Sequence, residues 1–66
     1  MAPHVQRMVD EQFELNARMN KLDDFMGSDD RFDVMDPVDQ LLMKQQLRNM
    51  RAYLATLMSR ISRASK

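Results

Sequence analysis

The stretch that decides the fold is LLMKQQLRNMRAYLATLMSRISRA, residues 41–64. Its apolar residues recur at steps of four and three, at Met43, Leu47, Met50, Leu54, Leu57, Ile61 and Ala64. This spacing puts all seven side chains on one face of an α-helix, as in the seam of a coiled coil. Asp36 and Pro37 stand before it as an N-cap residue and a first-turn proline. We therefore expect a helix over about 37–64.

A second seam occupies the first part of the chain. Its a and d positions are Val5, Met8, Gln12, Leu15, Met19, Leu22 and Met26. Pro3 suits the first turn of this helix, and Gly27 suits a left-handed residue at its end. We expect a helix over about 3–26 and then an acidic loop over 27–36. The apolar residues of that loop are expected to fold back over the end of the seam.

Two helices of similar length, joined by about ten residues, favour an antiparallel hairpin. The predicted fold is therefore an all-α, coiled-coil-like hairpin that forms a single domain over residues 1–66. Pairing the two seams places three pairs of flanking residues side by side: His4 with Arg60, Glu11 with Tyr53, and Arg18 with Gln46. Gln12 and Gln40 occupy a positions, where polar side chains are expected to fix the register.

The length of the chain predicts assembly. Sixty-six residues bury little surface, and the chain has no cysteine for disulfides or thiolate metal sites. Association is the remaining support, so we expect a homo-oligomeric bundle. Apolar residues outside the seams are the predicted subunit interface: Val9, Phe13, Leu41, Leu42 and Met58.

The charges of the chain separate along the sequence. Residues 1–40 carry ten acidic and four basic residues, whereas residues 41–66 carry six basic and no acidic residues. The halves either neutralise each other or leave one cationic surface for a partner. Binding to nucleic acid is not expected, because the net charge is zero and the acidic half would repel a phosphate backbone.

The sequence contains no catalytic, metal-binding or cofactor-binding motif. The single histidine, His4, has no cysteine or early serine that it could activate as a nucleophile. We therefore expect a protein that is not an enzyme and needs no cofactor or metal. No apolar run reaches the roughly 20 residues of a membrane span, and no signal-peptide pattern opens the chain. We therefore expect a cytoplasmic protein that does not associate with a membrane.

Arginine and an aromatic ring suggest a ligand site. Arg18 would hold a phosphate group and Tyr53 would stack on a base. Further phosphate contacts are predicted from Arg7, Lys21, Arg48 and Arg51. The alternative is that these residues form ordinary solvated helix faces, with ion pairs worth about 0.2–0.5 kcal/mol each.

Three stretches carry a resemblance to a known family. PHVQRMVDEQFEL (3–15), KLDDF (21–25) and LLMKQQLRNMRAYLATLMSRI (41–61) resemble a small family of tailed-phage proteins. That family reads Pro-His-x-x-Arg, Glu-x-x-Glu-Leu, Lys-Leu-x-x-Phe, a short acidic loop, and Met-x-x-Tyr-x-x-x-Leu-x-x-Arg-Ile. The resemblance covers nearly the whole chain. It implies a phage or prophage origin, a helical fold and a bacterial host cell, but no activity.

Two functional hypotheses follow. The first is a protein-interaction module that inhibits a host defence or regulatory protein, which requires an exposed apolar patch. The alternative is an oligomeric sponge that holds a cyclic nucleotide defence signal, which requires a pocket lined by arginine and an aromatic residue. The sequence supplies candidates for both.

Overall fold

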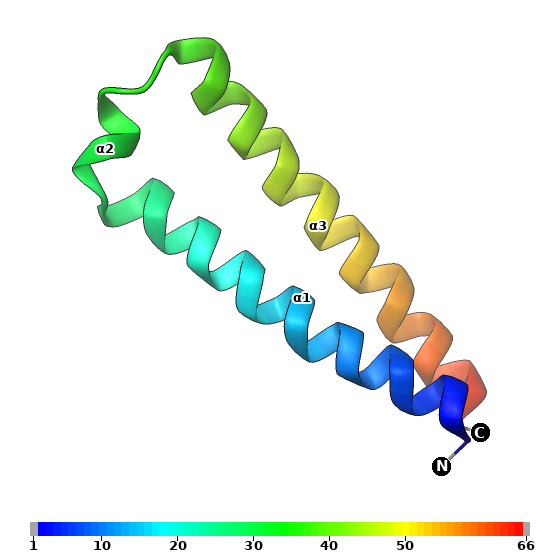
Figure 1. The fold of residues 1–66 in the computed structure, drawn as a ribbon. Helices are drawn as coiled ribbons and strands as arrows, with labels where there is room; N and C mark the ends of the chain where they lie inside the picture. Colours follow the sequence, from blue (N-terminus) through cyan, green and yellow to red (C-terminus); the bar gives the residue numbers. More distant parts are fainter. Residues whose placement is uncertain (1, 66) are drawn as a thin grey trace.

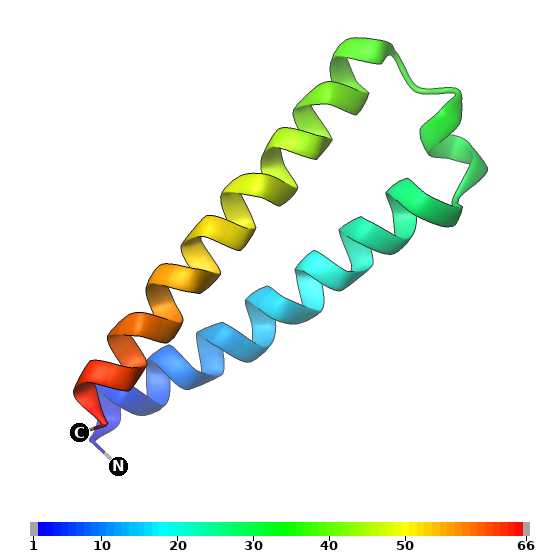
Figure 2. The same cartoon turned by 180° about the vertical axis from the view of Figure 1, so that it is seen from behind.

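The chain is all-helical, as the sequence predicts. The computed structural model describes residues 2–65, which form α1 (Pro3–Ser28), α2 (Asp30–Asp33) and α3 (Pro37–Ala64). α1 and α3 run antiparallel, with α2 in the connector between them (Figures 1 and 2). The result is a rod with extents of 46 × 16 × 13 Å.

The two long helices begin differently. At the start of α3, Asp36 accepts a hydrogen bond of 2.8 Å from the Val38 amide, and Pro37 fills the first turn. Asp39 adds a negative charge near the positive end of the helix dipole. At the start of α1, Pro3 is again in the first turn, but Ala2 provides no side-chain cap and the turn has no acidic residue. The positive end of α1 is therefore not neutralised by its own first turn.

The seam residues form the core, which consists of two clusters. Val5, Met8 and Leu57 make the cluster near the termini, and Leu57 is fully buried. The cluster nearer the connector is Leu15, Met19 and Leu47, with Leu22, Met26, Met50 and Leu54 partly buried against it. Gln12 lies between the clusters in the sequence of α1 and is half-buried. Because only two helices enclose it, this core leaves many of its side chains partly exposed to water.

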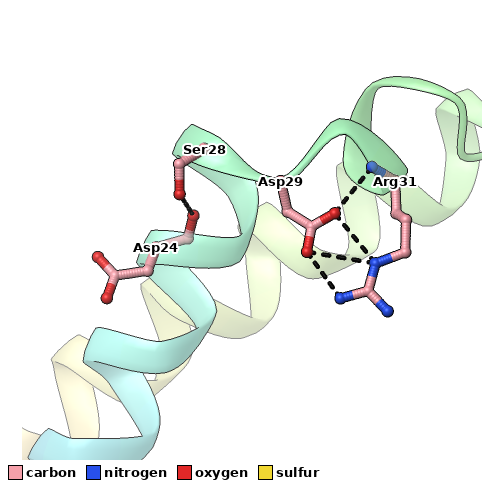
Figure 3. A network of polar contacts seen from close by, with 4 residues as sticks. All are labelled: Asp24, Ser28, Asp29 and Arg31. Atoms are coloured by element: carbon pink, nitrogen blue, oxygen red, sulfur yellow. Dashed lines mark hydrogen bonds and ion pairs between the residues drawn. The ribbon is translucent and has the colours of Figure 1, made fainter.

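The end of α1 differs from the sequence prediction. Gly27 is inside the helix and has no left-handed backbone conformation, so it is not the predicted cap. The helix runs one residue further, to Ser28, whose hydroxyl donates a 2.7 Å hydrogen bond to the Asp24 carbonyl (Figure 3). A Cβ atom on Gly27 would meet nothing within 4 Å, so neither close packing nor backbone conformation requires glycine here.

The connector is an ordered turn that begins with Asp29. The Asp29 carboxylate accepts from the backbone amide of Arg31 and pairs with its guanidinium at 2.7 Å (Figure 3). These hydrogen bonds lower the pKa of Asp29 to about 2 and raise that of Arg31. The Arg31 guanidinium also lies 5.5 Å from the centre of the Phe25 ring, within the range of a cation–π contact.

Apolar connector residues fold back over the seam only in part. Phe32 is buried and meets Phe25 in a T-shaped contact, with ring centres 6.2 Å apart. Met35 is half-buried, but Val34 is 84% exposed and does not contribute. Phe32 is therefore the connector residue that contributes most to the apolar packing at this end of the hairpin.

Gln40 has a different role from the one its seam position suggests. Its side-chain amide donates to the Phe32 carbonyl at 2.8 Å and to the Met35 carbonyl at 3.1 Å, with the Asp33 carbonyl at 3.4 Å. These acceptors all lie in the connector. Gln40 thus ties the connector to the first turn of α3, and nothing in these contacts sets the register of α1 against α3.

Candidate functional site

A hydrogen bond between the long helices marks one flank of the hairpin. The Tyr53 hydroxyl on α3 donates to the Glu11 carboxylate on α1 at 2.5 Å, as the predicted pairing of these residues requires. This hydrogen bond, with smaller contributions from desolvation and the negative charge of Glu11, raises the pKa of Tyr53. The positive charge of Arg60 acts in the opposite direction.

Helical spacing extends this flank in both directions. His4 and Arg18 each lie seven residues from Glu11, so both share its face of α1. Arg60 and Gln46 lie seven residues from Tyr53 on the antiparallel helix. We call this side of the hairpin the Tyr53 flank. His4 and Arg60 do line one groove, whereas the proximity of Arg18 to Gln46 remains a prediction.

A groove of about 490 Å³ runs along α3 on the Tyr53 flank. It combines apolar surface with three side-chain amides, and its lining residues are Leu42, Gln45, Gln46, Asn49, Met50 and Tyr53. Apolar walls with a few polar groups are typical of small-molecule sites. The amides supply both donors and acceptors, and the Tyr53 ring, held by Glu11, supplies a flat surface.

A second groove, of about 350 Å³, lies where the ends of α1 and α3 meet. His4 and Met8 line it from α1, and Arg60, Arg63 and Ala64 line it from α3. None of these five residues is acidic. Among residues 2–65 the ion pairs are Arg31 with Asp29 and Arg51 with Asp23, so neither arginine of this groove takes part in one.

The predicted ligand residues are all exposed, but they do not gather at one place on a single chain. Arg51 pairs with Asp23 at 3.9 Å. It is also two residues from Tyr53, a spacing that puts two helical side chains on different faces. Lys21 lies in a groove near the connector that it shares with Asp24, Asp29 and Asp30. The other members of the predicted set are Arg7, Arg18 and Arg48, and no contact joins them to Tyr53.

The predicted interface residues are mostly exposed on one chain. Phe13 is 68% exposed, Leu41 65%, Leu42 55% and Met58 49%, whereas Val9 is half-buried. Val34 and Val38 are further exposed apolar residues, and the sequence prediction did not include them in the interface. Of the predicted interface residues, Leu42 also lines the groove along α3, so this groove adjoins the exposed apolar surface.

Sequence reasoning missed the amides Gln45 and Asn49 and the arginines Arg60 and Arg63 as site residues. The signal was present in part, since Leu42, Gln46, Asn49 and Tyr53 follow one another at steps of four, three and four, parallel to the seam. Polar residues at such positions are common on any solvated helix face. For this reason the spacing alone did not distinguish them.

The match to a family model spans residues 2–63 and carries the description Sequestin. The chain belongs to the Sequestin family. No curated protein and no solved structure has significant similarity to it. The name of the Sequestin family agrees with a binding or sequestering role and leaves the partner unspecified.

Neither a metal-binding cluster nor a membrane-spanning helix is found in the part of the chain that the structure describes. Residues 2–65 contain no group of three or more His, Cys, Asp or Glu side chains placed to hold a metal ion. No helix within the same residues is long and apolar enough to cross a membrane. The features of this Sequestin-family chain most suited to binding a partner are the groove along α3, the groove between the helix ends and the exposed apolar surface.

Proposed function

We propose that this Sequestin-family protein is a non-enzymatic, phage-encoded sponge that sequesters a nucleotide-type signal in the cytoplasm of a bacterial host. The observation that carries this proposal is the groove along α3, where Tyr53 and three side-chain amides adjoin apolar surface. Aromatic rings stack on bases, and asparagine and glutamine amides match the donor and acceptor pattern of base edges. The family name supports sequestration as the mode of action.

The sponge functions as a homo-oligomer. The groove along α3 is lined by one helix and is open, whereas small-molecule sites usually bury most of their ligand. A second copy packed on the exposed apolar residues beside it, such as Leu42, would close the groove and bury those residues together. Arg18 comes from the α1 side of the Tyr53 flank and supplies positive charge for a phosphate group.

A protein target is the second candidate, and the exposure of Phe13 and Leu41 favours it. Aromatic and aliphatic side chains of this size are common anchors in protein interfaces. In this version the chain inhibits a host defence or regulatory protein. Native mass spectrometry of protein purified from its host would separate the candidates, because it reports subunit number, a retained nucleotide and a co-purified protein in one measurement.

A thermal-shift panel tests the sponge directly. The panel contains cyclic dinucleotides, cyclic trinucleotides and cyclic ADP-ribose isomers. A ligand specific for the folded state stabilises it by about 2.7 kcal/mol at a hundredfold excess over its dissociation constant. For a chain of this size we expect the melting midpoint to rise by several degrees.

Substitutions test whether the ligand-induced rise in the melting midpoint depends on the groove along α3. Tyr53→Ala removes the ring from the groove along α3 and should abolish the shift. Arg18→Ala removes the proposed phosphate contact and should do the same, whereas Lys44→Ala, at an exposed α3 position outside that groove, should retain the shift. Sedimentation should give the same oligomer for all three variants. If no member of the panel stabilises the protein and a host protein co-purifies instead, the sponge is wrong and the protein-inhibitor candidate replaces it.

A further inference from the structure

We infer that the groove between the ends of α1 and α3 is an anion site that binds the phosphate groups of the sequestered ligand. This inference deepens the proposed function and rests on it for the identity of the ligand. The groove brings together His4 from α1 and Arg60 and Arg63 from α3. Guanidinium groups bind phosphate oxygens through paired hydrogen bonds, so the chemical class recognised here is a phosphate or pyrophosphate group.

The first support is that no carboxylate lines the groove. α3 has no acidic residue after Asp39, so it brings none to this end of the rod. On α1 the nearest acidic residues, Asp10 and Glu11, lie outside the groove and accept hydrogen bonds from Gln6 and Tyr53. Arg60 and Arg63 take part in no ion pair with residues 2–65, which leaves their charges for an external anion.

The second support is the position of the groove relative to the groove along α3. Both lie on the Tyr53 flank, with Tyr53 at one end of the first groove and Arg60 in the second. These residues are seven positions apart on α3, which corresponds to roughly 10 Å along the helix axis. A ligand with its base against Tyr53 would place its phosphates beside Arg60.

The backbone adds a smaller contribution at the same end. The first turn of α1 has neither a side-chain cap nor an acidic residue, so its positive end is not neutralised locally. The negative end of α3 opposes this effect and interacts favourably with Arg63, which lies in the last turn. Because the helix ends act in opposite directions, the side chains of Arg60, Arg63 and His4 carry the site.

The site is tested with inorganic pyrophosphate as the probe, at constant ionic strength and with NMR detection on the full chain. We expect saturable shift changes at His4, Arg60 and Arg63, with a dissociation constant on the order of 1 mM, as befits a small fragment. Arg60→Gln and Arg63→Gln should each weaken binding about tenfold. Lys44→Gln makes the same change in net charge at an exposed position of α3 outside both of these grooves, and it should bind as the native protein does.

Two outcomes would overturn the site. If Lys44→Gln weakens pyrophosphate binding as much as Arg60→Gln does, the effect reflects overall charge and the site is wrong. If either glutamine variant loses helix content by circular dichroism, Arg60→Lys and Arg63→Lys replace them in the test, because lysine keeps the positive charge. These lysine variants should then bind more tightly than the glutamine variants, and equal binding would overturn the proposal.

The same experiment separates this inference from the proposed function. Pyrophosphate binding without a response to any nucleotide would keep the anion site and reject the sponge. A nucleotide-induced stabilisation that Arg60→Gln and Arg63→Gln leave unchanged would keep the sponge and reject the anion site.

Discussion

The two ends of the hairpin hold their charges in different ways. At the connector end, Asp29 pairs with Arg31 and Asp36 caps α3, so both carboxylates have partners within two residues. At the end near the termini, Arg60 and Arg63 line a groove and have no ion-pair partner among residues 2–65. The same kinds of charge therefore stabilise a turn at one end and remain available for a partner at the other.

This difference would allow a chain with no net charge to bind an anion at the proposed site. Capping carboxylates are bonded to backbone amides and to a neighbouring guanidinium, which limits how far they can neutralise the distant arginines of α3. Screening by salt adds to the separation, because the Debye length of about 8 Å at physiological ionic strength is much shorter than the 46 Å rod. Net charge is thus a poor guide to binding for this molecule.

The largest expected effect comes from breaking the core near the termini. Leu57→Ala removes the fully buried side chain of the cluster that includes Val5 and Met8. We expect a loss of about 2–5 kcal/mol in the free energy of unfolding, because a cavity replaces a buried leucine. Chemical denaturation at one fixed protein concentration measures it, since the proposed assembly would make stability depend on concentration. Arg48→Ala, at an exposed position on the same helix, should change stability by less than about 0.5 kcal/mol. A similar loss in both variants would contradict the role of Leu57.

A smaller effect is expected from loosening the connector. Gln40→Ala removes the amide that holds the Phe32 and Met35 carbonyls, and we expect a loss of about 1 kcal/mol. Gln40→Glu should lose more, because it places a carboxylate against the same carbonyl oxygens. Hydrogen exchange at the Met35 amide, which donates to the Phe32 carbonyl, should accelerate in both variants. Gln46→Ala is the matched control, and acceleration there too would show that the connector does not depend on Gln40.

The smallest expected effect is on the acid stability of the connector. The pKa of Asp29 is lowered from 3.8 to about 2 by its hydrogen bonds to Arg31. The charged carboxylate therefore stabilises the folded state above about pH 4, and this contribution is lost as the pH falls through about 2. NMR titration of the Asp29 carboxyl group should give a midpoint near 2, well below 3.8. Arg31→Gln should move the Asp29 midpoint upward, and an unchanged midpoint would mean that the pair does not hold the carboxylate.

The two seams could be predicted because their apolar residues recur at the period of an α-helix. Leu47, Leu57 and Met19 are buried where the steps of three and four place them, and the Glu11–Tyr53 contact follows from pairing the seams. The connector was less predictable. α2 is only four residues long, too short to show a period, and the sequence gives no sign that Gln40 bonds to carbonyls. Gly27 was wrongly read as a helix end because glycine permits the left-handed conformation without requiring it.

Within the candidate site, Tyr53 was the residue that the sequence predicted best. It was predicted as the aromatic group of a ligand site, and it lines the groove along α3. Predicting which arginines join it required three-dimensional placement, because Arg51 and Arg60 look alike in the sequence. In the structure Arg51 is paired with Asp23, and Arg60 lines a groove.

The Gln40 contacts also bear on the order in which the hairpin forms. They join residues only five to eight positions apart, so the chain reversal closes with little loop entropy. Contacts of such short sequence separation form early in folding. We expect pairing of α1 and α3 to proceed from the connector toward the termini, which makes the arginine-lined groove the last part to assemble. An anion held there would tie together the two segments that are furthest apart in the chain.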